Sequence, residues 1–171
     1  MRYFFFSYII FCASLAAQQT DYERAWDAYT SGQYEEALTA IEQCLTGDTS
    51  NYRYVFLKGR TLESLYRYDE AIVALQKALL LYPDGREAQA ALATLYLVLG
   101  QPDVSAQFYE KLAVAEPQIN RWKMSWATAL MAAGNHKNAL EQLKIVVQND
   151  TTNWLVYKYM GDCYYRLDFG V

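Results

Sequence analysis

The chain has 171 residues, of which 53% are hydrophobic and 16% aromatic, with 16 tyrosines. This composition excludes a disordered protein and suits one domain with a sizeable core or a short array of repeats. The 3 prolines and 8 glycines leave few helix breakers, which favours long helices. A formal net charge of −4 without blocks of Lys or Arg argues against nucleic acid or anionic lipid as the main partner.

The first predicted element is a secretory signal peptide over residues 1–17. Arg2 supplies one early positive charge, an apolar run continues to about Ala13, and small residues follow. Cleavage is expected after Ala16 or Ala17. The alternative is a retained membrane anchor, but the run is shorter than the roughly 20 residues that a spanning helix needs. We therefore expect an exported protein that is periplasmic, associated with the cell envelope, or secreted.

From residue 18 onward the sequence repeats with a fixed period of 34 residues. Stretches of the same pattern, such as SGQYEEALTAIEQCL and LYRYDEAIVALQKAL, begin at residues 31, 65, 99 and 133. The predicted domains are therefore repeats over 18–51, 52–85, 86–119 and 120–153, and the first helix of a fifth, incomplete repeat over 154–171.

Small residues occupy two fixed positions of the repeat. The eighth position holds Ala25, Gly59, Ala93, Ala127 and Gly161, and the twentieth holds Ala37, Ala71, Ser105 and Ala139. Large apolar residues such as Leu62 and Leu75 recur at other fixed positions. Two antiparallel helices cross closely only where bulk is absent. The pattern therefore predicts a pair of helices in each repeat, with the small residues at their crossing.

The spacing of apolar residues predicts the limits of these helices. The clearest are expected over 52–65, 68–81, 86–99 and 103–116. Gly100 and Gly134 suit the left-handed end of a first helix, and acidic residues such as Asp103 suit the start of a second helix. Pro83 and Pro117 fall where each repeat should end, because proline cannot continue a helix.

These features resemble the tetratricopeptide repeat in unit length, in the pattern of small and large residues, and in the terminal proline. The resemblance covers about 18–171. The repeat over 52–85 fits best, with family residues at Gly59, Leu62, Tyr68, Ala71, Leu75, Ala78 and Pro83. The resemblance implies an all-α fold, a right-handed superhelical solenoid of antiparallel helix pairs. It also implies a protein–protein interaction module that is not an enzyme.

In proteins of this family the first helices line a concave face. The residues that the resemblance places on that face as candidates for partner binding are Tyr22, Trp26, Tyr29, Arg53, Phe56, Arg60, Thr94, Leu97, Arg121, Met124, Thr128 and Met131. Aromatic residues, Met and Arg are favoured at binding surfaces. The alternative for each is packing against an adjacent repeat. The leading hypothesis is an exported adaptor that holds a peptide or helix of a partner protein.

One specialised class of tetratricopeptide repeat domain is excluded by the residues at its binding positions. Repeat domains that grip the acidic C-termini of cytosolic chaperones use a clamp of Lys, Asn and Arg. The matching positions here hold Tyr22, Trp26, Leu57 and Glu87, so the clamp is absent.

The sequence offers little for catalysis. His136 is the single histidine, in a predicted solvated turn between Asn135 and Lys137. No metal-binding, nucleophile or phosphate-cradling motif occurs. Cys44 and Cys163 lie several repeats apart, so we expect two buried thiols and no disulfide. We expect no cofactor, no metal, no nucleic acid and no membrane insertion after signal removal.

The last predicted helix, from Trp154 onward, has no partner helix in the sequence. We expect that the sequence is a fragment of a longer repeat array. The alternatives are that this helix is itself the cap of the array, or that it associates with another protein. Two alternative functions stay open: a structural or assembly segment of an envelope complex, and the repeat portion of a longer enzyme or sensor.

Overall fold

The computed structural model describes residues 21–169, and the signal peptide predicted over 1–17 lies outside them. All regular structure in the described part is helical. The described chain divides between Ala88 and Gln89 into two compact units, which we call the N-terminal and C-terminal units. Within residues 21–169, no helix combines the length and the apolar character that crossing a membrane requires.

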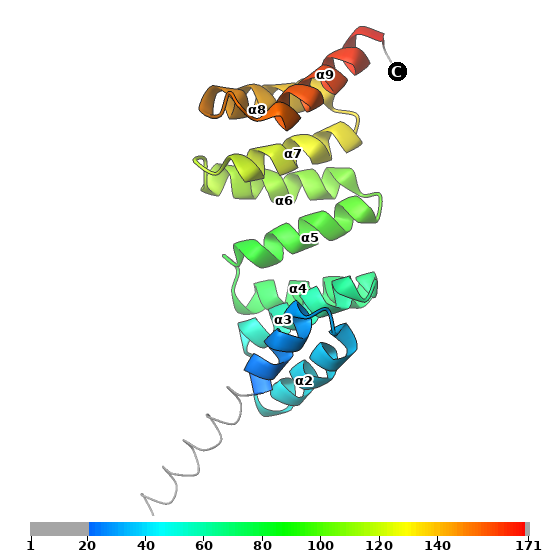
Figure 1. The fold of residues 1–171 in the computed structure, drawn as a ribbon, viewed down its shortest axis with the longest axis vertical. Coiled ribbons are helices and arrows are strands. Elements are labelled where there is room, and N and C mark those ends of the chain that lie inside the picture. Colours follow the sequence, from blue (N-terminus) through cyan, green and yellow to red (C-terminus); the bar gives the residue numbers. More distant parts are fainter. Residues whose placement is uncertain (1–20, 170–171) are drawn as a thin grey trace, which may run out of the picture. The chain divides into compact units, whose positions relative to one another are not determined.

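The helices follow one another at the period expected from the sequence. The N-terminal unit contains a helix over 21–30, then α2 (Tyr34–Gly47), α3 (Tyr52–Ser64) and α4 (Tyr68–Leu81) (Figure 1). Then follow α5 (Arg86–Val98), which begins at the boundary, α6 (Pro102–Ala115), α7 (Asn120–Ala132), α8 (His136–Asn149) and α9 (Trp154–Phe169). The four clearest helices predicted from the sequence differ from these limits by at most one residue. The limits assigned to the repeats and to the signal peptide stay a prediction.

The helix ends follow from local backbone chemistry. Gly32, Gly100 and Gly134 have φ values of 78°, 71° and 78°, the left-handed conformation that closes a first helix. The same repeat position in the second repeat is Tyr66, which adopts φ 60° without being glycine. Pro83 follows the end of α4 by two residues, where it cannot interrupt the helix.

The predicted small positions lie at the centre of the helix pairs. Ala37, Ala71, Ser105 and Ala139 are each 0% exposed. In the N-terminal unit, a Cβ added to Gly59 of α3 would stand 2.7 Å from Leu75 Cγ of α4. The two helices therefore pack with no room for a side chain at this point. The prediction of an all-α fold built from antiparallel helix pairs is confirmed.

The last helix of the described chain differs from its counterparts. In α9, a Cβ added to Gly161 would meet nothing within 4 Å. Tyr164 of α9 is 45% exposed, whereas Leu62 at the same repeat position in α3 is 1% exposed. At these two positions α9 is open where α3 is covered, whereas Val156 and Cys163 of α9 are 0% exposed.

Candidate protein-binding surface

Six of the twelve candidates belong to the N-terminal unit and come from the helix over 21–30 and from α3. We call this set the aromatic–arginine surface, and its members are Tyr22, Trp26, Tyr29, Arg53, Phe56 and Arg60. Tyr22 and Arg53 lie close together, because the Arg53 Cζ atom is 4.7 Å from the centre of the Tyr22 ring. The Tyr22 ring also contacts the buried Tyr54 ring, with 5.4 Å between the ring centres. The guanidinium is thus held above an aromatic face.

Trp26 supplies the largest exposed ring of this surface. It is 44% exposed, and its ring centre lies 5.9 Å from that of Tyr29. Tyr29 is half-buried and packs against a core cluster that contains Ala25, Ile41 and Leu57. An exposed indole therefore stands on a ring that the core holds in place.

Phe56 is half-buried and belongs to a separate aromatic stack within the same unit. Its ring is 5.8 Å from that of Tyr52 with an interplanar angle of 7°, and Tyr52 meets Tyr82 edge-on at 5.3 Å. Burial raises the pKa of the Tyr52 phenol. No ring contact joins Phe56 to Trp26 in the described residues, so the structure provides two aromatic groups rather than one continuous cluster.

The two arginines of the surface differ in whether their guanidinium groups are already paired with a carboxylate of this chain. Arg60 Nη1 donates to Glu63 Oε2 at 2.6 Å, an ion pair within α3. Burial raises the pKa of the Glu63 carboxyl, and the neighbouring Arg60 opposes that rise. Arg53 is exposed and forms no ion pair within the part of the chain that the structure describes. The free cation of this surface is therefore Arg53.

The six candidates of the C-terminal unit lie on α5 and α7, and much of their polar chemistry is satisfied internally. The Thr94 hydroxyl lies 2.8 Å from the Tyr109 hydroxyl, and Thr128 donates to the Met124 carbonyl at 2.9 Å. Arg121 is exposed, and its Cζ atom lies 4.1 Å from the centre of the buried Trp122 ring. The remaining candidates, Leu97, Met124 and Met131, are half-buried. This group therefore offers Arg121 and partly covered apolar side chains.

A cavity of about 500 Å³ in the C-terminal unit was not predicted. Its lining residues are Met131, Ala132, His136, Asp162, Tyr165 and Arg166, from α7, α8 and α9. The prediction that His136 is a solvated turn residue is wrong, because it begins α8 and is half-buried. Its Nδ1 atom is buried without a hydrogen-bond partner among the described residues. No group of three or more His, Cys, Asp or Glu in the described part could hold a metal ion.

Two further residues escaped the sequence reasoning. Tyr52 and Tyr54 support Phe56 and Tyr22, and neither was among the candidates. The signal was available for Tyr52, because residues four apart on a helix share a face. Cys44 and Cys163 are free and buried as predicted, and burial raises the pKa of both thiols.

Comparison with known families agrees with this architecture. Two family models described as tetratricopeptide repeat match residues 22–85 and 64–125, together more than half of the chain. A stretch of 106 residues is 27% identical to the Hsp70-Hsp90 organizing protein of Triticum aestivum. That stretch is 62% of this chain but only 18% of the wheat protein.

Solved structures share the fold. One described as MamA 41-end from Desulfovibrio magneticus RS-1 superimposes with a TM-score of 0.82 at 18% identity, covering 88% of this chain and 85% of that one. A crystal structure of MamA protein gives a TM-score of 0.78 at 16% identity, covering 86% and 81%. At these identities the likeness establishes the helical repeat fold alone.

Proposed function

The chain belongs to the tetratricopeptide repeat family, and from that premise we propose that it is an exported, non-enzymatic adaptor. In this proposal the aromatic–arginine surface binds a peptide or helix of a partner protein. The family consists in general of protein-interaction modules, which supports the coarser part of the proposal. The export part is supported by the signal-like sequence of residues 1–17.

The observation that carries the proposal is the state of Trp26 and Arg53. Each is exposed, and each is held by an aromatic ring of the folded core, Tyr29 and Tyr22 respectively. Exposed Trp and Arg are the residues that most often dominate binding energy. Because both are already supported in the free protein, less conformational entropy is lost when a partner binds.

This arrangement favours an extended or helical peptide with one aromatic or aliphatic anchor and a carboxylate. The anchor would pack on the Trp26 indole, and the carboxylate would pair with Arg53. Arg60 contributes less, because Glu63 already occupies its guanidinium.

The wheat relative does not supply the partner. Its name associates it with Hsp70 and Hsp90. Here two positions of the clamp for acidic chaperone tails hold Tyr22 and Trp26. We therefore propose a partner that presents an apolar anchor as well as an acidic group.

A second candidate function is docking through α9. Trp154 is 71% exposed, Tyr165 is 59% exposed, and the open side of Gly161 lies on the same helix. This function corresponds to association through the last helix, one of the alternatives that the sequence leaves open. In it, the chain would be a structural or assembly segment of a larger complex.

Selection from a displayed library of random peptides separates the two functions. The purified full chain serves as bait, and binding of the enriched peptides is measured for W26A/F56A and for W154A. Loss in W26A/F56A but not in W154A, with unchanged helicity by circular dichroism, supports the aromatic–arginine surface. Loss only in W154A supports docking through α9 and rejects the first proposal.

A further inference from the structure

Three large apolar side chains project outward along α4 and the turn before it. Tyr66, Val73 and Leu80 are 78%, 66% and 83% exposed. Val73 and Leu80 are separated by 7 residues within α4, the spacing that aligns side chains along one side of a helix, and Tyr66 lies in the turn 7 residues before Val73. We call these residues the α4 stripe. It lies on α4 and the preceding turn, and not on the helices that carry the aromatic–arginine surface.

The other repeats have no such stripe. At the three corresponding positions they carry Gly32, Thr39 and Thr46, then Gly100, Gln107 and Val114, then Gly134, Glu141 and Gln148. Only Val114 among these is a large apolar residue, and it is 71% exposed. The repeat fold therefore does not require apolar residues at these positions. The stripe needs another explanation.

Tyr66 occupies its position against a backbone preference. Its φ is 60°, and its neighbours make the same closing hydrogen bonds as those around Gly32, Gly100 and Gly134. A non-glycine residue in the left-handed region is strained. The Tyr66 ring is 78% exposed, and it makes an edge-on contact with the neighbouring Tyr68 ring at 6.1 Å, which glycine would lack. Such a residue suggests an intermolecular role.

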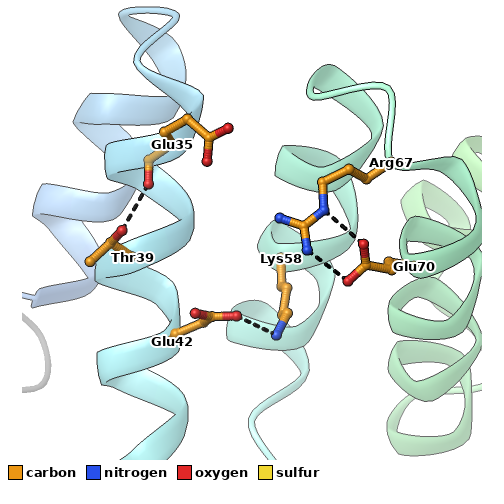
Figure 2. A network of polar contacts seen from close by, with 6 residues as sticks. All are labelled: Glu35, Thr39, Glu42, Lys58, Arg67 and Glu70. Atoms are coloured by element: carbon orange, nitrogen blue, oxygen red, sulfur yellow. Dashed lines mark hydrogen bonds and ion pairs between the residues drawn. The ribbon is translucent and has the colours of Figure 1, made fainter.

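The charges beside the stripe are arranged with equal spacing about Val73. Asp69 lies four residues before Val73 and Lys77 four residues after it. Neither makes an ion pair with another residue of the described chain. Their neighbours are already engaged, as Figure 2 shows: Lys58 bonds Glu42 at 2.8 Å, and Arg67 bonds Glu70 at 2.7 and 2.8 Å.

A groove runs along the same side of α4. It has a volume of about 390 Å³ and lies between α2 and α4 over α3. Val55, Leu62 and Ala74 contribute apolar lining, and Val73 lies on the groove and on the stripe. Asp69 and Lys77 also line it. An apolar surface with one unpaired charge of each sign therefore continues from the stripe into the groove.

We propose that the α4 stripe binds the α4 stripe of a second copy of this chain, with the two helices antiparallel and a two-fold axis passing beside Val73. In this register Val73 meets Val73 of the second copy, and Tyr66 meets Leu80. Asp69 meets Lys77 at both ends of the pair, so the two unpaired charges complement each other. Residue i contacts j and j contacts i, as a two-fold interface requires.

The expected dimer is weak. One pair of helices buries less than the roughly 1,200 Å² of total surface that specific stable complexes usually bury. We expect a dissociation constant on the order of 10 µM. Light scattering after size-exclusion chromatography of the full chain, over a range of concentrations, should show reversible dimers. A chain that stays monomeric throughout overturns the proposal.

A matched pair of variants locates the interface. V73E places two like charges at the two-fold axis and should abolish dimers. V114E introduces the same change at an equally exposed valine on α6 and should leave them unchanged. Self-association that survives V73E, or that V114E removes equally, contradicts the proposed interface.

Charge exchange tests the antiparallel register. D69K and K77D each bring like charges together at both ends of the pair, and each should weaken dimerisation about tenfold. An equimolar mixture of D69K and K77D should form heterodimers, because opposite charges then face each other. The double variant D69K/K77D should also recover the dimer. Failure of both to recover it rejects this register.

Tyr66→Gly separates binding from folding. Because glycine relieves the strained φ, it should raise the unfolding midpoint of the dilute monomer by about 2–4 °C. It should also weaken the dimer, because Leu80 of the second copy loses its contact. A variant that is more stable and dimerises as strongly as the wild type shows that Tyr66 has no part in the interface.

Discussion

Gly59 on α3 faces Leu75 on α4 so closely that a Cβ on Gly59 would lie 2.7 Å from Leu75 Cγ and 2.8 Å from Leu75 Cδ2. Gly161 holds the same repeat position on α9 and meets nothing within 4 Å. One position of the repeat thus has two different environments within one chain.

The first prediction uses this contrast. Gly59→Ala should destabilise the protein by about 1–3 kcal/mol, because the added methyl group forces the two helices apart. Gly161→Ala should stabilise it by about 0.5–1 kcal/mol, because alanine favours the helix and nothing obstructs it. Urea unfolding followed by circular dichroism measures both. Equal effects of the two substitutions would contradict the crossing described for α3 and α4.

The second prediction concerns Ser105. This residue is fully buried, and its hydroxyl has no hydrogen-bond partner among the described residues. Ser105→Ala should stabilise the protein by about 1 kcal/mol, since an unsatisfied hydroxyl is removed at a position where three other repeats carry Ala.

Thr61 provides the control for this experiment. It is also 0% exposed, but its hydroxyl donates to the Leu57 carbonyl at 2.8 Å. Thr61→Val should therefore fail to stabilise the protein in the same thermal or urea measurement. Stabilisation by Thr61→Val but not by Ser105→Ala would show that the two hydroxyls have been assigned wrongly.

The helices could be predicted closely from the sequence, because their determinants are local. Small residues such as Ala71, breakers such as Pro83 and the left-handed Gly100 mark a crossing, an end and a turn. Each has a counterpart one period away. Because the same residue types recur at each period, the limits of a helix such as 68–81 can be predicted more closely than from one copy alone.

The surface could be predicted only as a set of positions. The sequence places Thr94 and Arg60 on one face, but it does not show that the Thr94 hydroxyl bonds Tyr109 or that Glu63 pairs with Arg60. Those contacts depend on rotamers and on neighbouring helices. Likewise, nothing in the local sequence predicts that Tyr66 adopts a left-handed backbone conformation. It does so at the repeat position where the other repeats have glycine.

The third prediction is a pH dependence at Glu63. Because burial raises its pKa, the folded protein holds the Glu63 proton more tightly than the unfolded chain. Stability from this group is complete at low pH and falls as the pH rises through the ordinary glutamate range, from about pH 4 upward. Glu63→Gln should therefore raise the free energy of unfolding at pH 7, with the gain vanishing below about pH 4.

Glu70 should show the opposite sign. Its hydrogen bond from Arg67 lowers the pKa of its carboxyl, so its contribution is present at neutral pH and is lost as the pH falls. Glu70→Gln should lower stability at pH 7 and have no effect in acid. Chemical unfolding of both variants across the pH range measures this difference. Parallel pH profiles for the two would contradict the assigned environments.

The fourth prediction concerns the buried thiols. Burial raises the pKa of Cys44 and Cys163, which keeps both in the unreactive thiol form at neutral pH. Iodoacetamide should modify both slowly in the native protein and rapidly in urea. Mass spectrometry of the peptides that contain each cysteine reports the rates separately. Rapid native modification of either one would show that its helix opens or that the thiol is exposed.

The central claim is that the aromatic–arginine surface binds a peptide, and titration of one library-selected acidic peptide tests it most directly. Fluorescence anisotropy gives its dissociation constant for the wild-type chain, W26A/F56A and E63Q. We predict at least about a tenfold loss for W26A/F56A, since the exposed Trp26 ring and the half-buried Phe56 ring together should contribute more than about 1 kcal/mol at such a surface. We predict tighter binding for E63Q, because Arg60 is released to the peptide. Equal affinity for all three proteins, with helicity intact, would contradict the claim.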